Sequence, residues 1–266
     1  MPSLSIGFVL GMVVLGIGVG LVSAALGLGG GILMVPAFIA FIPGMDAHTA
    51  KGTSLFIIIF VAALNTWRLG RGQSDNPWRL AMVMAIGSVA GGYVGGWVTS
   101  LMPDDVVVWI FILFLLIAAV RTFFMQPRVV HAEDVRRRTP TAIGIGAVSG
   151  IVGGATGTGG GLVMVPLSLI AGVVTNERAV QLSNMVMVAT GIAGTIAHLR
   201  ASPTTALPYT MGHVNFALAP LVFIGAQLAA PYGIRVERML TLSRRKLVMG
   251  ALLLVISVRL AYQALR

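Results

Sequence analysis

The sequence contains no cysteine and few charged residues, and each of these two features excludes several classes of protein. Without cysteine the chain has no disulfide, no thiolate-ligated metal cluster and no thiol nucleophile. Charged residues make up 10% of the 266 residues, against roughly 25% in ordinary soluble domains. Hydrophobic residues make up 57%, and the mean hydropathy is +0.94. A soluble fold of this length could not bury that much apolar surface, so we exclude soluble, disordered and fibrous proteins. We expect most of the chain to lie in lipid.

Acidic residues are scarce even among the charged ones, with 8 Asp and Glu against 18 Lys and Arg and a net charge of +10. No Asp or Glu lies in the middle of a predicted span, which argues against a carboxylate-based sodium or proton site at the membrane midplane. The basic residues lie between apolar runs, where they act as topology signals. We therefore expect a lipid bilayer around the chain and no nucleic-acid partner.

Two of the apolar runs, 1–45 and 141–175, are too long for one membrane helix of about 20 residues and contain many glycines. The first 25 residues have no basic segment, so we expect an uncleaved span and not a signal peptide. The positive-inside rule places the basic loops 68–79, 121–140 and 233–246 in the cytoplasm and the loops 102–105 and 200–209 outside. The run 141–175 must then enter and leave on one side as a hairpin, and by the same reasoning so does 1–45.

An internal repeat has an offset of 130 residues. Residues 24–36 read AALGLGGGILMVP and residues 154–166 read GATGTGGGLVMVP, with eight of thirteen positions identical. Loop 68–79 is basic while its counterpart 200–209 is nearly neutral, as an inverted repeat requires. We predict an all-α polytopic membrane protein with two inverted repeats of about five membrane segments each and glycine-broken helical hairpins. The predicted units are a first repeat at 1–125, a cytoplasmic linker at 126–140 and a second repeat at 141–266.

The two glycine-rich elements are candidate anion-binding sites. Non-helical backbone inside a membrane is tolerated only where protein buries it or water lines it, and the amides of a helix start attract anions. We expect the two elements to meet near the midplane and to expose their amides to a shared cavity; the alternative is that they only form turns or let helices touch. No GK[ST] follows them, so we expect neither a P-loop nor a cofactor. The candidate glycines are Gly29, Gly30, Gly31, Gly159, Gly160 and Gly161.

Polar residues in otherwise apolar helices are the second group of candidates. Lys51 would attract the anion; the alternative is that it snorkels to the membrane interface. Hydroxyls and amides would replace the hydration shell of the anion, and we expect the clusters of the two halves to approach each other. The candidates are Lys51, Thr53 and Ser54 in the first half, and Thr156, Thr158, Gln181, Ser183 and Asn184 in the second half.

Other buried polar residues have a simpler interpretation. We expect each of them to hydrogen-bond a neighbouring helix or the interface, although histidine could relay protons near neutral pH. Gly87, Gly91 and Gly95 form one helix face and predict a close helix–helix contact. The other polar residues are Asn65, Thr66, His198, His213, Asn215 and Gln227.

The GxGGGxxMVP element in each half, with the AKGTSL segment (Ala50 to Leu55) about twenty residues after the first, resembles the TauE/SafE family of sulfite exporters. The resemblance extends from about residue 7 to 262. It implies a secondary transporter, an exporter, of a small anion such as sulfite or an organosulfonate in a bacterial inner membrane. The resemblance does not identify the anion or say whether the chain forms a homo-oligomer. Gln181 and Asn184 stand where the first half has Lys51 and Ser54, so the two halves need not contribute equally.

Two other classes of function compete with a transporter. An intramembrane serine protease would need a GxSG motif, and Ser149-Gly150 lacks that spacing. A magnesium-dependent transferase would need paired aspartates, and only Asp104-Asp105 occur together, in a predicted tight turn. We therefore expect no enzyme. A passive anion channel remains the alternative, because inverted repeats with paired half-helices also build channels.

Overall fold

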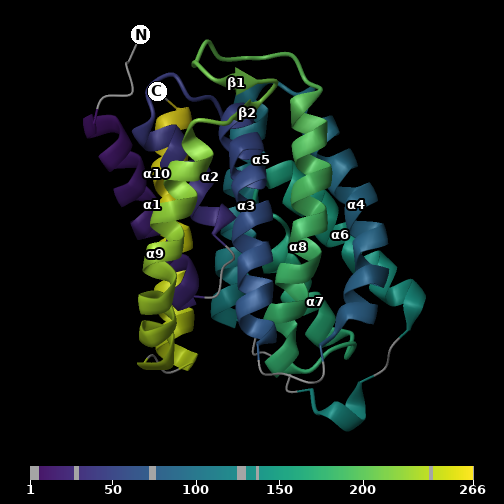
Figure 1. Ribbon diagram of the computed structural model, residues 1–266. Coiled ribbons are helices and arrows are strands. Elements are labelled where there is room, and N and C mark those ends of the chain that lie inside the picture. Colours follow the sequence, from purple (N-terminus) through teal and green to yellow (C-terminus); the bar gives the residue numbers. More distant parts are fainter. Residues whose placement is uncertain are drawn as a thin grey trace.

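The computed structural model describes residues 6–26, 30–71, 76–124, 130–135, 138–239 and 242–265. Within them the chain forms ten α-helices, one short 3-10 helix and one two-stranded hairpin (Figure 1). The elements are α1 Ile6–Leu26, α2 Gly31–Phe41, α3 Ala47–Gly70, α4 Trp78–Ser100, α5 Asp104–Phe124, η1 Ala132–Asp134, α6 Thr139–Thr156, α7 Gly161–Ile170, α8 Asn176–Leu199, β1 Thr210–Met211, β2 Val214–Asn215, α9 Leu218–Met239 and α10 Leu242–Ala264.

Five helices are long and apolar enough to cross a membrane: α3, α4, α5, α8 and the Lys246–Ala264 part of α10. Shorter apolar stretches lie in α1, α2, α7 and α9. The expectation of an all-α, multi-pass membrane protein is therefore confirmed.

The chain breaks at both glycine-rich elements, as the sequence predicts. The first break separates α1 from α2 and ends at Gly30; the second break, residues 157–160, separates α6 from α7. Gly30, Gly157, Gly159 and Gly160 have φ angles of 80°, 75°, 77° and 84°. Only glycine adopts this left-handed region without a steric penalty, so the glycines create the breaks. The candidate Gly29 lies outside the described residues.

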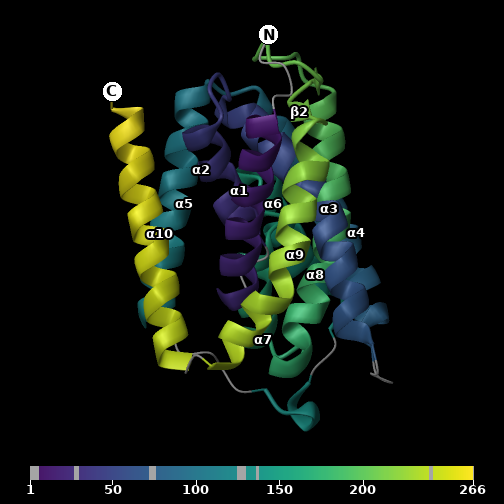
Figure 2. The same ribbon diagram turned by 60° about the vertical axis from the view of Figure 1, so that its left-hand side comes forward.

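The start of α1 and the end of α10 lie at one end of the bundle, called here the termini end, and η1 lies at the opposite, linker end (Figures 1 and 2). Helices α1, α3 and α5 run from the termini end toward the linker end, and α4 runs back. Helices α6, α8 and α10 run toward the termini end, and α9 runs away from it. Each of these helices in the first half thus has a counterpart in the second half that runs the opposite way.

The two most extensive helix contacts, α4 with α6 and α1 with α9, both join one half of the chain to the other. Glycine makes these contacts possible. A Cβ on Gly87, Gly91 or Gly95 would collide with the backbone of α6, and a Cβ on Gly146 would collide with the carbonyl oxygen of Met84. The glycine face predicted for α4 is therefore confirmed as a close helix–helix contact.

The repeat offset fails after α8. The offset places the counterpart of Trp78 at residue 208 (78 + 130), but α9 begins at Leu218. The intervening chain forms the antiparallel β1–β2 hairpin, in which Thr210 pairs with Asn215. The sequence analysis did not predict this hairpin, which lies at the termini end (Figure 1).

The glycine contact can be tested on α6 with two matched substitutions. Gly146→Ala places a Cβ against the backbone of α4 and should destabilise the protein by about 1–3 kcal/mol through overpacking. Gly144→Ala, on the same helix, meets nothing within 4 Å and should be neutral or stabilising by up to about 1 kcal/mol. Thermal unfolding of both variants in detergent measures the difference; equal melting temperatures would contradict the close contact.

Candidate functional site

The start of α2 lies against the second break. A Cβ on Gly31, the first residue of α2, would be 2.7 Å from the Cα of Thr158 in the second break and 2.6 Å from Cδ1 of Ile58. A Cβ on Gly159 would be 3.1 Å from Cγ2 of Ile58 and 3.0 Å from Cε of Met187. The space next to the breaks is thus occupied by Ile58 of α3 and Met187 of α8, which we call the central apolar pair. The expected cavity shared by the backbone amides is filled here by these side chains.

Lys51, Thr53 and Ser54, the lysine cluster, lie in the first two turns of α3 and are fully buried. Ser54 Oγ donates a hydrogen bond of 2.8 Å to the carbonyl of Gly157. Thr53 Oγ1 accepts a 2.9 Å hydrogen bond from the backbone N–H of Asn215. A Cβ on Gly157 would be 2.8 Å from the Cα of Lys51. The polar start of α3 therefore lies directly against the second break.

Lys51 is 0% exposed, and its Nζ makes no hydrogen bond within the described part of the chain. The snorkelling alternative is therefore excluded, since a snorkelling ammonium would reach the surface. Asp46 and Asp104 lie at the same end of α3, but they cap its first turn: Asp46 accepts from the N–H of Thr49 at 2.7 Å and Asp104 from the N–H of Ala47 at 2.9 Å. A buried ammonium without a hydrogen-bonded counter-ion costs several kcal/mol.

Gln181, Ser183 and Asn184, the amide cluster, lie at the other end of the bundle, near the start of α8. Gln181 Nε2 donates to Asn76 Oδ1 at 2.5 Å, and Ser183 Oγ contacts the sulfur of Met187 at 3.7 Å. Gln181 also lines a cavity of about 330 Å³. The other residues that line it are Ala63, Thr66, Trp67, Gly70, Arg71, Asn76, Trp78 and Met185.

The lysine and amide clusters do not approach each other, so that expectation is wrong. Helices α3 and α8 run antiparallel, with Asn65 Nδ2 3.5 Å from Asn184 Oδ1. Ser54 precedes Asn65 by eleven residues, which corresponds to about 16 Å along a helix at 1.5 Å per residue. Each cluster lies at the start of its own helix, and antiparallel helices start at opposite ends.

The second break connects the two clusters. Gly157 accepts the hydrogen bond of Ser54, and a Cβ on Gly161 would be 3.1 Å from Ser183 Oγ. Between them, Thr156 Oγ1 lies 2.8 Å from Thr158 Oγ1 and donates to the Val152 carbonyl at 2.7 Å. A Cβ on Gly160 would collide with the carbonyl oxygen of Ser149, so Gly160 is required by packing against α6.

Three histidines, which we call the histidine cluster, gather beside the lysine cluster: His48 of α3, His198 of α8 and His213 of the hairpin. The rings of His48 and His213 stack with centroids 4.9 Å apart, and Nδ1 of His198 lies 3.3 Å from Nδ1 of His213. The sequence analysis overlooked His48. Its spacing of three residues from Lys51 on one helix was the available signal, because such residues share a face.

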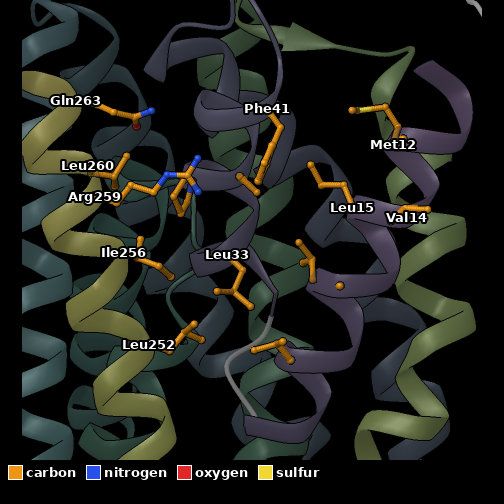
Figure 3. A pocket seen from close by; sticks show the side chains of 16 residues that line it. Met12, Val14, Leu15, Leu33, Phe41, Leu252, Ile256, Arg259, Leu260 and Gln263 are labelled. Atoms are coloured by element: carbon orange, nitrogen blue, oxygen red, sulfur yellow. The ribbon is translucent and has the colours of Figure 1, made fainter. Parts of the chain in front are cut away.

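The largest of three described cavities is a groove of about 620 Å³ between α1, α2 and α10 (Figure 3). Among its sixteen lining residues, only Arg259 and Gln263 have polar side chains. Arg259 lies over the ring of Phe41 at 5.2 Å. A small hydrated anion would lose its water here with little compensation, so we do not place the substrate in this groove.

A family model described as "Sulfite exporter TauE/SafE" matches residues 12–260. The chain belongs to the TauE/SafE family. The family model covers both breaks and all three clusters. Because TauE/SafE proteins are membrane transporters, the expectation that the chain is no enzyme is confirmed.

Curated relatives are distant but cover most of their length and of this chain. "Probable membrane transporter protein YunE" of Bacillus subtilis is 25% identical, with 96% of this chain and 97% of the relative covered. A relative with the same description from Methanocaldococcus jannaschii is 25% identical, with 91% of each chain covered. One from Haemophilus influenzae is 27% identical, with 81% of each covered. No solved structure matches the chain significantly.

The separation of the clusters predicts different accessibility from the linker end. The chain has no native cysteine, so Gln181→Cys and Ser54→Cys can be compared without background. Gln181→Cys should react with a membrane-impermeant maleimide added at the linker end, because residue 181 lines a cavity there. Ser54→Cys should not react, since it is fully buried. Equal labelling from that end would contradict the separation.

Proposed function

We propose that this TauE/SafE protein is a secondary transporter, an exporter, of a small anion such as sulfite or an organosulfonate in a bacterial inner membrane. It works by alternating access at a site between two inverted repeats. The observation that carries the proposal is the buried Lys51, whose Nζ has no partner within the described residues. An anion at this position supplies the missing counter-ion.

The groups around Lys51 suit an anion that binds reversibly. The hydroxyl of Ser149 is buried and has no hydrogen-bond partner in the described part of the chain. A Cβ on Gly160 would be 3.5 Å from the Cβ of Ser149, which places this serine at the second break. One cation attracts the anion, and the neutral donors around it replace the hydration shell of the anion. Several fixed cations would bind the anion more strongly and slow its release.

The central apolar pair, Ile58 and Met187, favours a carrier over the alternative of a passive channel. It lies between the lysine cluster and the amide cluster along α3 and α8, where residues 55–64 of α3 are all apolar. A channel needs a continuous polar path, whereas a carrier needs a barrier that opens on one side at a time. The anion therefore passes only when α3, α8 or the breaks move.

The helix directions support an inverted repeat. Helices α1, α3, α4 and α5 run opposite to α6, α8, α9 and α10, taken in that order (Figures 1 and 2). The two main contacts, α4 with α6 and α1 with α9, are equivalent when the two halves are exchanged. We infer two repeats within 1–125 and 141–266, joined by the linker 126–140. The positive-inside rule then puts the linker end in the cytoplasm.

The inferred topology can be tested with single cysteines at exposed positions. Arg71→Cys and His131→Cys should be labelled from the cytoplasmic side, because they lie at the linker end, and Ser202→Cys from the opposite side. Labelling of intact cells and of inverted membrane vesicles with an impermeant maleimide distinguishes the sides. Labelling of Arg71→Cys and Ser202→Cys from the same side would overturn the inverted repeat.

The proposed activity is tested by uptake into proteoliposomes of sulfite, sulfoacetate, thiosulfate and lactate. A carrier saturates and exchanges internal for external anion, whereas a channel passes current in proportion to the gradient. Lys51→Met should lower kcat/KM for the transported anion about tenfold to a hundredfold, because a charged interaction contributes roughly 1.5–3 kcal/mol. The matched control is Lys246→Met, which removes the chain's other lysine from a basic segment with Arg244 and Arg245 and should change little. Equal transport by both variants would remove Lys51 from the site.

A further inference from the structure

The histidine cluster is not explained by anion binding alone. His48, His198 and His213 come from three different elements and from both halves, and each is at most 3% exposed. The His198 and His213 ring centroids lie 5.5 Å apart, and those of His48 and His213 lie 4.9 Å apart. Packing between apolar helices requires no imidazole, because buried polar groups cost free energy unless they are paired.

His48 Nδ1 is buried and has no hydrogen-bond partner in the described residues. His198 and His213 contact each other and have the backbone of Gly154 and Ser202 as further partners. An unsatisfied buried polar group costs about 1–3 kcal/mol, so the free nitrogen of His48 calls for a role. The His48 Nε2 atom contacts the Met102 carbonyl at 3.1 Å. That carbonyl can only accept, so neutral His48 carries its proton on Nε2 and leaves Nδ1 free to bind another.

The cluster forms a row from the surface to Lys51. At its outer end, His48 Nε2 lies 3.8 Å from Asp104 Oδ1, and the Asp104 side chain is 42% exposed. At its inner end, a Cβ on Gly52 would be 3.1 Å from the Cβ of His198, so His198 packs beside the residue next to Lys51. Between them, the 3.3 Å Nδ1–Nδ1 contact requires that one of His198 and His213 donates a proton to the other.

Burial is the main cause that keeps His213, the hairpin member of the row, neutral when no anion is bound. The titratable and charged groups that face it are Asp46, His48 and Lys51 of α3, Asp104 of α5 and the other two histidines. Burial, together with the neighbouring His48, lowers the pKa of His213 to about 4. Burial raises the pKa of Asp46, but hydrogen bonds from Thr204 and Thr49 outweigh it and hold that pKa below its usual value. A negative charge added beside Lys51 would favour a proton on the imidazoles.

We propose that His48, His213 and His198 form a proton-binding site that is loaded when an anion occupies the site at Lys51, so that anion and proton cross the membrane together. The inference rests on the proposed function. A proton from solvent forms an N–H bond on His48 Nδ1, which the Nε2 contact with Met102 leaves free, and that bond breaks when the proton is released with the anion. With one proton per monovalent anion no net charge moves, and the concentration gradient of the anion can drive export. Binding of anion and proton must then strengthen each other equally.

The test measures protons moved per anion in proteoliposomes that contain a pH-sensitive dye, with the membrane potential clamped by potassium and valinomycin. The probe is radiolabelled sulfoacetate, with sulfite in a second series. Sulfoacetate carries two negative charges at neutral pH, so one proton per anion leaves one negative charge to cross, which the clamp compensates. The unmodified protein should move one proton per anion. In His48→Gln and His198→Gln this ratio should fall toward zero, whatever rate of anion movement remains. The matched control His131→Gln, exposed at the linker end, should keep the ratio of the unmodified protein.

A ratio of zero in the unmodified protein, or an unchanged ratio in both cluster variants, would overturn the inference while leaving the proposed transport intact. If the variants fail to fold, the pH dependence of the unmodified protein provides the test. Its KM for sulfoacetate should rise as the pH is raised above about 4, the pKa of His213, because the proton that strengthens anion binding is then lost. A KM independent of pH would overturn the coupling. Failure of the unmodified protein to move either anion would overturn the proposed substrate class and the coupling with it.

Discussion

Direct backbone contact between helices of opposite halves is the constraint on which the rest of the structure depends. Apolar side chains do not drive helices together in lipid, so association relies on close van der Waals packing at small residues. Gly87, Gly91 and Gly95 let α4 touch α6, while Gly16 and Gly225 let α1 touch α9. Neither half can form its own bundle in this arrangement, because each main contact needs one helix from the other half. The start of α2 is held against the second break as a result.

The breaks in turn place the start of α3 in an enclosed polar environment. Ser54 donates a hydrogen bond to the Gly157 carbonyl, and Gly157 has no side chain that would displace Lys51. A Cβ at position 157 would lie 2.8 Å from the Cα of Lys51 and would displace the lysine. The same glycine thus permits the turn, with its φ of 75°, and the burial of the ammonium. The chemistry of the site follows from a backbone requirement.

The sequence was sufficient to predict the helix breaks, the glycine face of α4 and the burial of polar residues near the start of α3. These features depend on local composition and spacing, which a single sequence contains. The meeting of the lysine and amide clusters was predicted wrongly, because a repeat offset identifies equivalent residues but not the register in which α3 packs on α8. His48 and His213 were not joined in the prediction, since His213 lies on the β1–β2 hairpin and that hairpin has no counterpart in the first half.

The two halves of the chain carry different residues at equivalent positions of the proposed site. Lys51 occupies the position equivalent to Gln181, so the termini end holds a buried cation with three histidines and the linker end holds neutral amides beside a cavity. A symmetric pair of lysines would attract an anion equally from both sides and hold it more strongly. In the proposed mechanism, an anion gains its counter-ion at one end of α3 only, and movement past Ile58 and Met187 exchanges that charge for neutral hydrogen bonds. The proposed carrier would then have two unequal faces, one that binds the anion and one that releases it.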